Sequence, residues 1–405
     1  MVTLGCRLNL AESESIRALL GSRDVVVVNS CAVTNEALKA TRAAIRRARR
    51  ERPHAELVVT GCAATIDPAG IGAMAEVDRV VANPAKLDGA AWGALEPAPP
   101  ARFAGHARAF VEVQNGCDHA CTFCAIPAGR GRSRSVPAGA VIERIAALVA
   151  AGHAEVVLTG VDLTSYGHDL PGTPTLGMLV ERMLTLVPGL ARLRLSSLDG
   201  VEIDDRLFDL LTGERRVMPH VHLSLQAGDD LILKRMKRRH SRRESVALAE
   251  RLKAARPAIA LGADLIAGFP TEDAAMFERT LALLDDCDIV HAHIFPFSPR
   301  SGTPAARMPQ VAREVVRERA ARLRARAAER RNDWLQAAVG TDCRILVERP
   351  GDRGHAEDHA PVTLDTHHPP GSIVAARVVA VAGDALSAVA LATGPSPSDP
   401  HTGTL

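Results

Sequence analysis

Apolar and polar positions alternate in two different periods along the first part of the chain. Short apolar runs at residues 3–6, 25–31 and 57–62 have the length of buried strands. Stretches with helical spacing of apolar residues follow at 11–20 and 35–52. Such alternation of strand and helix is typical of a parallel sheet covered on both faces. The sequence therefore predicts an α/β domain over residues 1–96.

A second series of strands and helices begins after a segment rich in proline and alanine at 96–100, which is typical of a linker. Six strand-then-helix units follow, with strands expected at 110–115, 155–160, 191–196, 220–226, 261–267 and 289–295. Six consecutive units predict an incomplete (β/α)6 barrel over residues 103–335. The active site of such a barrel lies at the carboxyl ends of its strands.

The last part of the chain changes character again. A long Arg-rich amphipathic helix is expected at 311–338, closed by Gly340. Short β-rich runs separated by turns then predict a small OB-like β-barrel over residues 338–394. We expect a disordered tail at 395–405. The fold class is thus α/β, with a small all-β domain at the end.

Composition narrows the class of protein. Of the 405 residues, 47% are hydrophobic and 24% are charged, which is ordinary for a globular protein and excludes a disordered or fibrous chain. The longest apolar runs fall well short of the ~20 residues that a membrane-spanning helix needs. The sequence shows neither a spanning segment nor a secretory leader, and we expect a cytoplasmic protein.

Basic residues are clustered although the net charge is only +2. The clusters lie at 42–52, 130–134, 234–243 and 313–331. Any one of them is explained by a solvated helix face. Four together favour a polyanionic partner.

Three of the eight cysteines form a local motif, Cys117-x3-Cys121-x2-Cys124, on a loop after a predicted strand. In a reducing compartment, cysteines at such spacing indicate metal binding rather than disulfides. Three close thiolates can hold three irons of a 4Fe-4S cluster and leave the fourth open. Zinc is the alternative, but a structural zinc site needs four ligands, and only His119 lies nearby in the loop.

Three further cysteines, Cys6, Cys31 and Cys62, each follow a predicted strand of the N-terminal sheet. Ligands of open α/β sheets bind beyond the carboxyl ends of the strands, where these thiols would converge. A second cluster site is one interpretation. The alternative is that each is a small buried core residue.

The triplet at 117–124 matches the radical S-adenosylmethionine (SAM) signature, and the chain resembles the methylthiotransferase family over about residues 3–392. The matching segments are 3–9, 29–35, 60–62, 126–127, 130–132, 223–226, 234–236 and 268–272. Residues 31–35, 295–298 and 302–306 resemble the branch that modifies N6-threonylcarbamoyladenosine at position 37 of tRNA. The resemblance makes the C-terminal barrel a TRAM domain.

The resemblance implies a two-stage reaction with two 4Fe-4S clusters. The cluster of Cys117, Cys121 and Cys124 would cleave SAM to a radical that takes hydrogen from carbon 2 of the adenine. The auxiliary cluster of Cys6, Cys31 and Cys62 would hold a sulfur that a second SAM methylates before transfer. The anticodon loop of a tRNA partner presents such a base out of its stack. The sequence identifies neither the sulfur source nor the electron donor.

Further residues were assigned from their positions. Those expected to contact SAM are Phe123, beside the cluster, and the strand-end residues Gly160, Ser196, Gln226 and Gly268. Those expected to contact RNA phosphate are Arg130, Arg132 and Arg134. The alternative for the strand-end residues is that they serve turn geometry. The alternative for the three arginines is that they lie on a solvated loop. Residues interpreted as structural are Cys287, Cys343, His291, His293, His367 and His368.

Three functions are compatible with these features. The first is methylthio transfer to threonylcarbamoyladenosine in tRNA. The second is the same chemistry on isopentenyladenosine-37 or on an aspartate of a ribosomal protein. The third, of a different class, is a non-catalytic RNA-binding protein with structural zinc.

Overall fold

The computed structural model describes residues 1–21, 23–94, 103 and 105–391. The expected linker at 96–100 and the expected tail at 395–405 lie outside the described residues. The described part confirms the α/β class, with an N-terminal parallel sheet, a central set of βα units and a C-terminal barrel.

The N-terminal domain is a four-stranded parallel sheet in the order β1-β2-β3-β4. Its strands are β1 (Val2–Thr3), β2 (Val25–Ser30), β3 (Glu56–Gly61) and β4 (Arg79–Val81). Its helical segments are α1 (Arg7–Leu20), α2 (Asn35–Glu51), α3 (Cys62–Ile66), α4 (Pro68–Gly72), η1 (Asn83–Ala85) and η2 (Gly89–Trp92). Apolar side chains fill a core on each face of the sheet.

Two details of this sheet differ from the expectation. Strand β1 ends at Thr3 rather than at Cys6, because Gly5 adopts a positive φ of 87° and Cys6 is already the N-cap of α1. Strand β4 has only three residues, which is too short to carry a period that sequence analysis can detect.

The central domain carries the six expected long strands, each close to its predicted range. They are β5 (Arg108–Glu112), β8 (Glu155–Thr159), β9 (Arg192–Leu195), β10 (His220–Gln226), β11 (Ala260–Ala267) and β12 (Ile289–Pro296), with a short pair β6 (Gln114–Asn115) and β7 (Arg134–Ser135). The α-helices are α5 (Ile126–Arg130), α6 (Ala138–Ala150), α7 (Leu176–Leu186), α8 (Asp205–Gly213), α9 (Asp230–Met236), α10 (Arg242–Ala255) and α11 (Ala274–Asp286). Single 3-10 turns are η3 (Leu163–Ser165), η4 (Gly200–Glu202) and η5 (Pro304–Arg307).

The six strands form two parallel sheets of three, β5-β8-β9 and β10-β11-β12. Isolated parallel bridges from Leu193 to Val217 and from Leu198 to Leu223 connect the two sheets. Strand β9 has four residues, so it offers few backbone groups for continuous pairing with β10. Among the described residues, the outer strands β5 and β12 do not pair with each other, so the barrel is incomplete, and a large core fills the space between its strands and helices.

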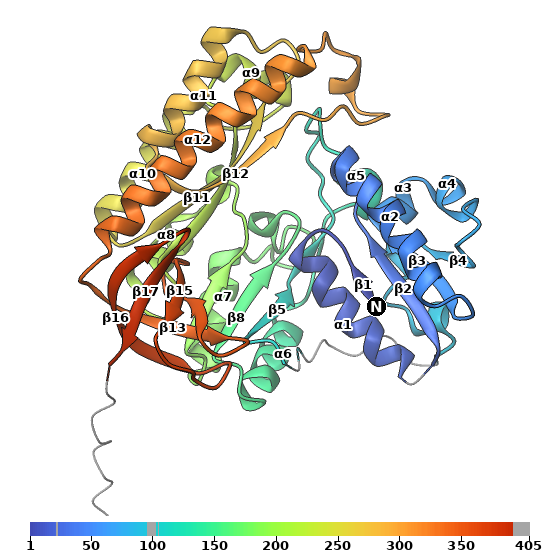
Figure 1. Ribbon diagram of the computed structural model, residues 1–405, viewed down its shortest axis with the longest axis horizontal. Helices are drawn as coiled ribbons and strands as arrows, with labels where there is room; N and C mark the ends of the chain where they lie inside the picture. Colours follow the sequence, from blue (N-terminus) through green and yellow to red (C-terminus); the bar gives the residue numbers. More distant parts are fainter. Residues whose placement is uncertain (22, 95–102, 104, 392–405) are drawn as a thin grey trace, which may run out of the picture.

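Helix α12 (Arg313–Ala337) leads to a closed five-stranded barrel in the order β13-β14-β15-β17-β16. The barrel strands are β13 (Asp342–Glu348), β14 (Arg353–His355), β15 (Pro361–Leu364), β16 (Ile373–Ala382) and β17 (Ala385–Ala390). In Figure 1 the blue N-terminal domain and the red barrel lie on opposite sides of the green central strands. Within the described ranges, no helix combines the length and apolarity required to cross a membrane.

Candidate functional site

The loop between β6 and α5 carries Cys117, Cys121 and Cys124 and is held by its own backbone. The N–H of Cys117 donates to the carbonyl of Gly131 at 3.1 Å. Two further backbone N–H groups donate to sulfur, from His119 to Cys117 and from Ile126 to Cys124, both at 3.4 Å. Amides that point at sulfur favour thiolate ligands.

Burial raises the pKa of the Cys117 thiol to about 12 and that of the Cys124 thiol to about 11. Both thiols therefore stay protonated at neutral pH until a metal displaces the proton. Cys117, His119 and Asp162 lie close enough to share one ion, but that set leaves out Cys121. The three-cysteine donor set of this loop fits a 4Fe-4S cluster with one open iron.

Arg238 connects this loop to the strands of the barrel. Its guanidinium lies 3.8 Å from the sulfur of Cys121 and donates to the backbone oxygen of Ser224 on β10 at 3.0 Å. The carboxylate of Asp199 pairs with it at 3.0 Å. Sequence analysis indicates only that Arg238 belongs to a basic cluster. Its contacts could not be predicted, because they depend on three separate segments.

Cys6, Cys31 and Cys62 lie at the carboxyl ends of three adjacent parallel strands. Cys31 follows β2, and Cys62 follows β3 and begins α3. A Cβ on Gly5 would lie 2.7 Å from the Cβ of Cys31, so only glycine lets the segment before Cys6 pass so closely. Burial raises the pKa of the Cys31 thiol, and the thiols of Cys6 and Cys62 add to the shift. Three free thiols at one sheet edge have the donor chemistry for a second cluster.

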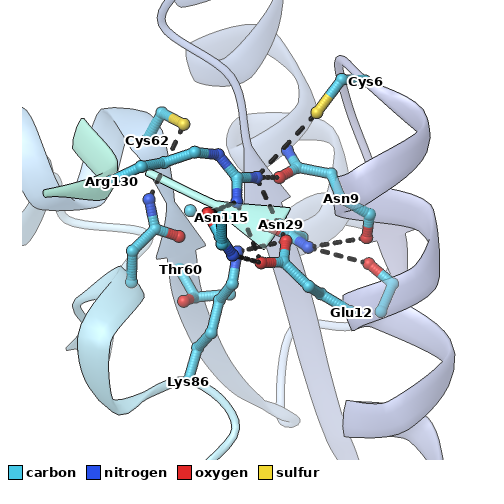
Figure 2. Close-up of polar contacts among 12 residues, drawn as sticks. Cys6, Asn9, Glu12, Asn29, Thr60, Cys62, Lys86, Asn115 and Arg130 are labelled. Atoms are coloured by element: carbon cyan, nitrogen blue, oxygen red, sulfur yellow. Dashed lines mark hydrogen bonds and ion pairs between the residues drawn. The ribbon is translucent and has the colours of Figure 1, made fainter. Parts of the chain in front are cut away.

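Arg130 reaches from α5 of the central domain into this second group of cysteines (Figure 2). Its guanidinium donates to Asn9 at 2.6 Å, to both carboxylate oxygens of Glu12 at 3.0 and 3.2 Å, and to Asn115 at 3.0 Å. It also lies 3.9 Å from the sulfur of Cys6. Arg130 is only 3% exposed. The expected RNA contact of Arg130 is therefore corrected: its donors are used inside the protein.

Lys86 completes this buried network from the other side, as Figure 2 shows. Its ammonium pairs with Glu12, and both side chains are almost fully buried. Burial alone would raise the pKa of Glu12, but Lys86 and Arg130 outweigh it and hold that pKa below its usual value. No local sequence pattern indicates the pairing of Glu12 with Lys86, because the two residues meet only in the folded chain.

The two other arginines of this segment lie at the surface. The side chain of Arg132 is 91% exposed and pairs with Asp118 at 3.4 Å. Arg134 donates back to the carbonyls of Arg130 and Arg132, both at 3.1 Å. An RNA contact of Arg132 or Arg134 stays a prediction.

The residues expected to contact SAM lie at the same end of the barrel. Gly160, Gln226 and Gly268 directly follow or end β8, β10 and β11, and Ser196 follows β9. Phe123 packs edge-on against Phe269, with ring centroids 6.4 Å apart. Their contact with SAM stays a prediction.

His291 and His293 of β12 have polar partners. His291 is buried and contacts the C-terminal barrel through the carbonyl of Asp358 at 3.2 Å. His293 forms a cluster with His222 and Asp264 that could hold an ion or a ligand. A purely structural interpretation of His293 is therefore incomplete.

Two family models match the chain. The model of the radical SAM superfamily matches residues 111–284, and that described as uncharacterized protein family UPF0004 matches residues 1–82. The first range contains the loop with Cys117, and the second contains Cys6, Cys31 and Cys62.

Several proteins of known name are similar over most of their length. Threonylcarbamoyladenosine tRNA methylthiotransferase MtaB of Rickettsia prowazekii is 45% identical, covering 94% of each chain. The protein of the same name from Bacillus subtilis is 35% identical, covering 79% of this chain and 78% of the other. The tRNA-2-methylthio-N(6)-dimethylallyladenosine synthase of Erythrobacter litoralis is 33% identical, covering 86% of each.

Among solved structures, the radical S-adenosylmethionine methyltransferase TsrM of Kitasatospora setae has a similar fold. Its TM-score is 0.52 at 16% identity, covering 73% of this chain and 66% of that one. At this identity the likeness concerns the fold alone.

Proposed function

Because the chain belongs to the radical SAM tRNA methylthiotransferase family, we propose that it adds a methylthio group to carbon 2 of N6-threonylcarbamoyladenosine at position 37 of tRNA. The observation that carries this proposal is the 45% identity to an enzyme of that name over 94% of both chains. Since its substrate would be tRNA, we also propose that the enzyme acts in the cytoplasm.

SAM and a 4Fe-4S cluster follow from membership in the radical SAM superfamily. We assign this cluster to Cys117, Cys121 and Cys124, and a second one to Cys6, Cys31 and Cys62. When bound, the first would supply one-electron activation of SAM, and the second would supply the sulfur to be transferred.

The protein's own residues hold these sites in a fixed relation. Arg238 joins the Cys121 loop to the carboxyl end of β10, where the barrel opens. Arg130 joins the segment after Cys124 to the helix that begins at Cys6. A reaction in which one site activates the base and the other delivers sulfur requires such a fixed geometry, because misplacement of about 1 Å can cost about 100-fold in rate.

Separate cysteine substitutions test the division of labour. We expect Cys121→Ala to abolish formation of 5′-deoxyadenosine from SAM. Cys31→Ala should retain that reaction but yield no methylthio product. Anaerobically prepared protein should contain about eight irons, two 4Fe-4S clusters, per chain. Equal loss of both activities in the two variants, or zinc in place of iron, would contradict the assignment.

Nucleoside mass spectrometry of tRNA tests the substrate. Cells without the gene should lack the methylthio form of threonylcarbamoyladenosine and accumulate the unmethylthiolated form. A loss confined to methylthio-isopentenyladenosine would instead assign the other nucleoside.

A further inference from the structure

The inner face of the β10-β11-β12 sheet carries an unusual group of polar residues. Along each strand, alternate side chains such as Leu223 and Leu265 pack into the core beneath the helices. His222, Asp264 and His293 occupy the opposite positions, which line the interior of the incomplete barrel. A charged group in that interior requires a polar partner.

One carboxylate oxygen of Asp264 bonds both histidines of this group. Oδ1 of Asp264 accepts from Nε2 of His222 at 3.0 Å and from Nδ1 of His293 at 3.1 Å. The two imidazole rings lie 4.6 Å apart and are tilted by 35°. His222 is buried, whereas the side chain of His293 is 64% exposed. Among the described residues, Nε2 of His293 has no hydrogen-bond partner, and the contact of Nδ1 with Asp264 orients the ring.

This group lies just below the radical SAM loop. Arg238 bonds both Cys121 and the backbone of Ser224, and Ser224 lies two residues beyond His222 on β10. Two residues of a strand span about 6–7 Å. The N–H of Ala305, beyond β12, also donates to the carbonyl of Thr122 in the loop at 2.9 Å. The loop is thus connected to β10 beside His222 and to the segment that follows β12, the strand of His293.

An exposed aromatic ring lies beside His293, nearer the carboxyl end of β12. Phe295 follows His293 by two residues on the same face of β12 and is 40% exposed. The ring of His293 meets it edge-on, with centroids 6.4 Å apart at 80°. Unstacked bases of RNA bind by stacking on such rings.

We propose that Phe295 and His293 form the site for the modified base, with Phe295 stacking on the adenine and Nε2 of His293 bonding the carboxylate of the threonyl substituent. This inference rests on the proposed function. Asp264 orients the imidazole, and a carboxylate at Nε2 would be the charged partner of this hydrogen bond. A dimethylallyl substituent offers no polar atom to this position.

The test compares two anticodon stem-loop RNAs that differ only in the threonyl carboxylate, one with the free acid and one with its methyl ester. The holoenzyme should bind the acid about 10- to 100-fold more tightly, the range for one hydrogen bond to a charged group. His293→Ala should bind both RNAs alike. Phe295→Ala should weaken binding of both RNAs equally.

His54→Ala is the matched control, since His54 is exposed on a loop of the N-terminal domain and should leave both affinities unchanged. A preference for the acid that survives in His293→Ala, or no preference in the wild type, would overturn the inference. Zinc bound by the wild type and lost in His293→Ala would assign the three side chains to a metal instead. A wild type that prefers the acid but transfers no methylthio group would refute the proposed function and not this site.

Discussion

At the scale of single residues, Arg130 decides how the auxiliary cysteines relate to the rest of the enzyme. It is buried, belongs to one domain and bonds Asn9 and Glu12 of another. A buried ion pair is weak evidence for added stability, but removing one partner leaves an uncompensated charge. Substitution of the buried Arg130 should therefore cost more stability than substitution of its exposed neighbour Arg132.

We predict that Arg130→Met lowers the free energy of unfolding of the N-terminal domain by about 3–5 kcal/mol, because Glu12 loses one of its two buried cationic partners and keeps only Lys86 of the two. Anaerobic urea unfolding followed by the fluorescence of Trp92 measures this, since the Trp92 indole donates to the carbonyl of Lys86 at 2.9 Å. Arg132→Met should stay within about 0.5 kcal/mol of the wild type. Similar losses in both variants would show that burial of Arg130 is not the cause.

At the scale of elements, the end of β11 meets helix α12 at Gly268. This residue has a φ of +72°, and a Cβ there would lie 2.6 Å from Cγ2 of Val316 on α12. The side chain of Glu272 accepts from the N–H of Gly268 at 2.9 Å and from Arg319 of α12 at 2.8 Å. The turn at the expected SAM site is therefore fixed by the helix behind it.

Gly268→Ala should destabilise the enzyme by about 1–2 kcal/mol from the left-handed backbone alone, with the contact to Val316 adding to this. Adding Val316→Ala removes the contacts with the two methyl groups, including the shortest one, but not the backbone strain. The double variant should therefore be more stable, by about 1 kcal/mol, than the sum of the single effects predicts. Thermal unfolding of the three variants measures the coupling, and strict additivity would contradict the close packing.

At the scale of the whole molecule, the C-terminal barrel closes the base of the central strands through buried charged and histidine side chains. Arg194 donates to the carbonyls of Ala356 and Glu357 at 2.8 Å, and Arg192 donates to the carbonyl of Arg344 at 2.8 Å. Burial, aided by Arg331, lowers the pKa of His291 to about 3. The interface therefore contains a histidine that stays neutral in the folded protein down to about pH 3.

The pH dependence of stability follows from this histidine. Below about pH 6.5, His291 of the unfolded chain binds a proton, whereas His291 of the folded chain stays neutral down to about pH 3. The free energy of unfolding therefore falls as the pH falls through this window. The slope is at most about 1.4 kcal/mol per pH unit for one group. His291→Gln should have a shallower profile than the wild type between pH 7 and 5, as measured by urea unfolding followed through Trp334, which lies 4.9 Å from His291. Parallel profiles would refute this account.

The sequence by itself determined the elements and the chemistry that lie within one segment. The cysteine triplet at 117–124 can be recognised in the sequence because its three ligands share one loop. The six strands of the barrel can be predicted from local periodicity. The convergence of Cys6, Cys31 and Cys62 was predictable because parallel strands align their carboxyl ends.

Only the tertiary structure decided what depends on contacts between distant segments. Arg130 looked like a surface residue of a basic loop, and its burial became evident only where Glu12, 118 positions earlier in the chain, meets it. The cluster of His222, Asp264 and His293 likewise depends on the register of three strands. A sequence pattern shows how often apolar residues recur. It does not show which distant side chains come together in the low-dielectric interior, where buried charges find their partners.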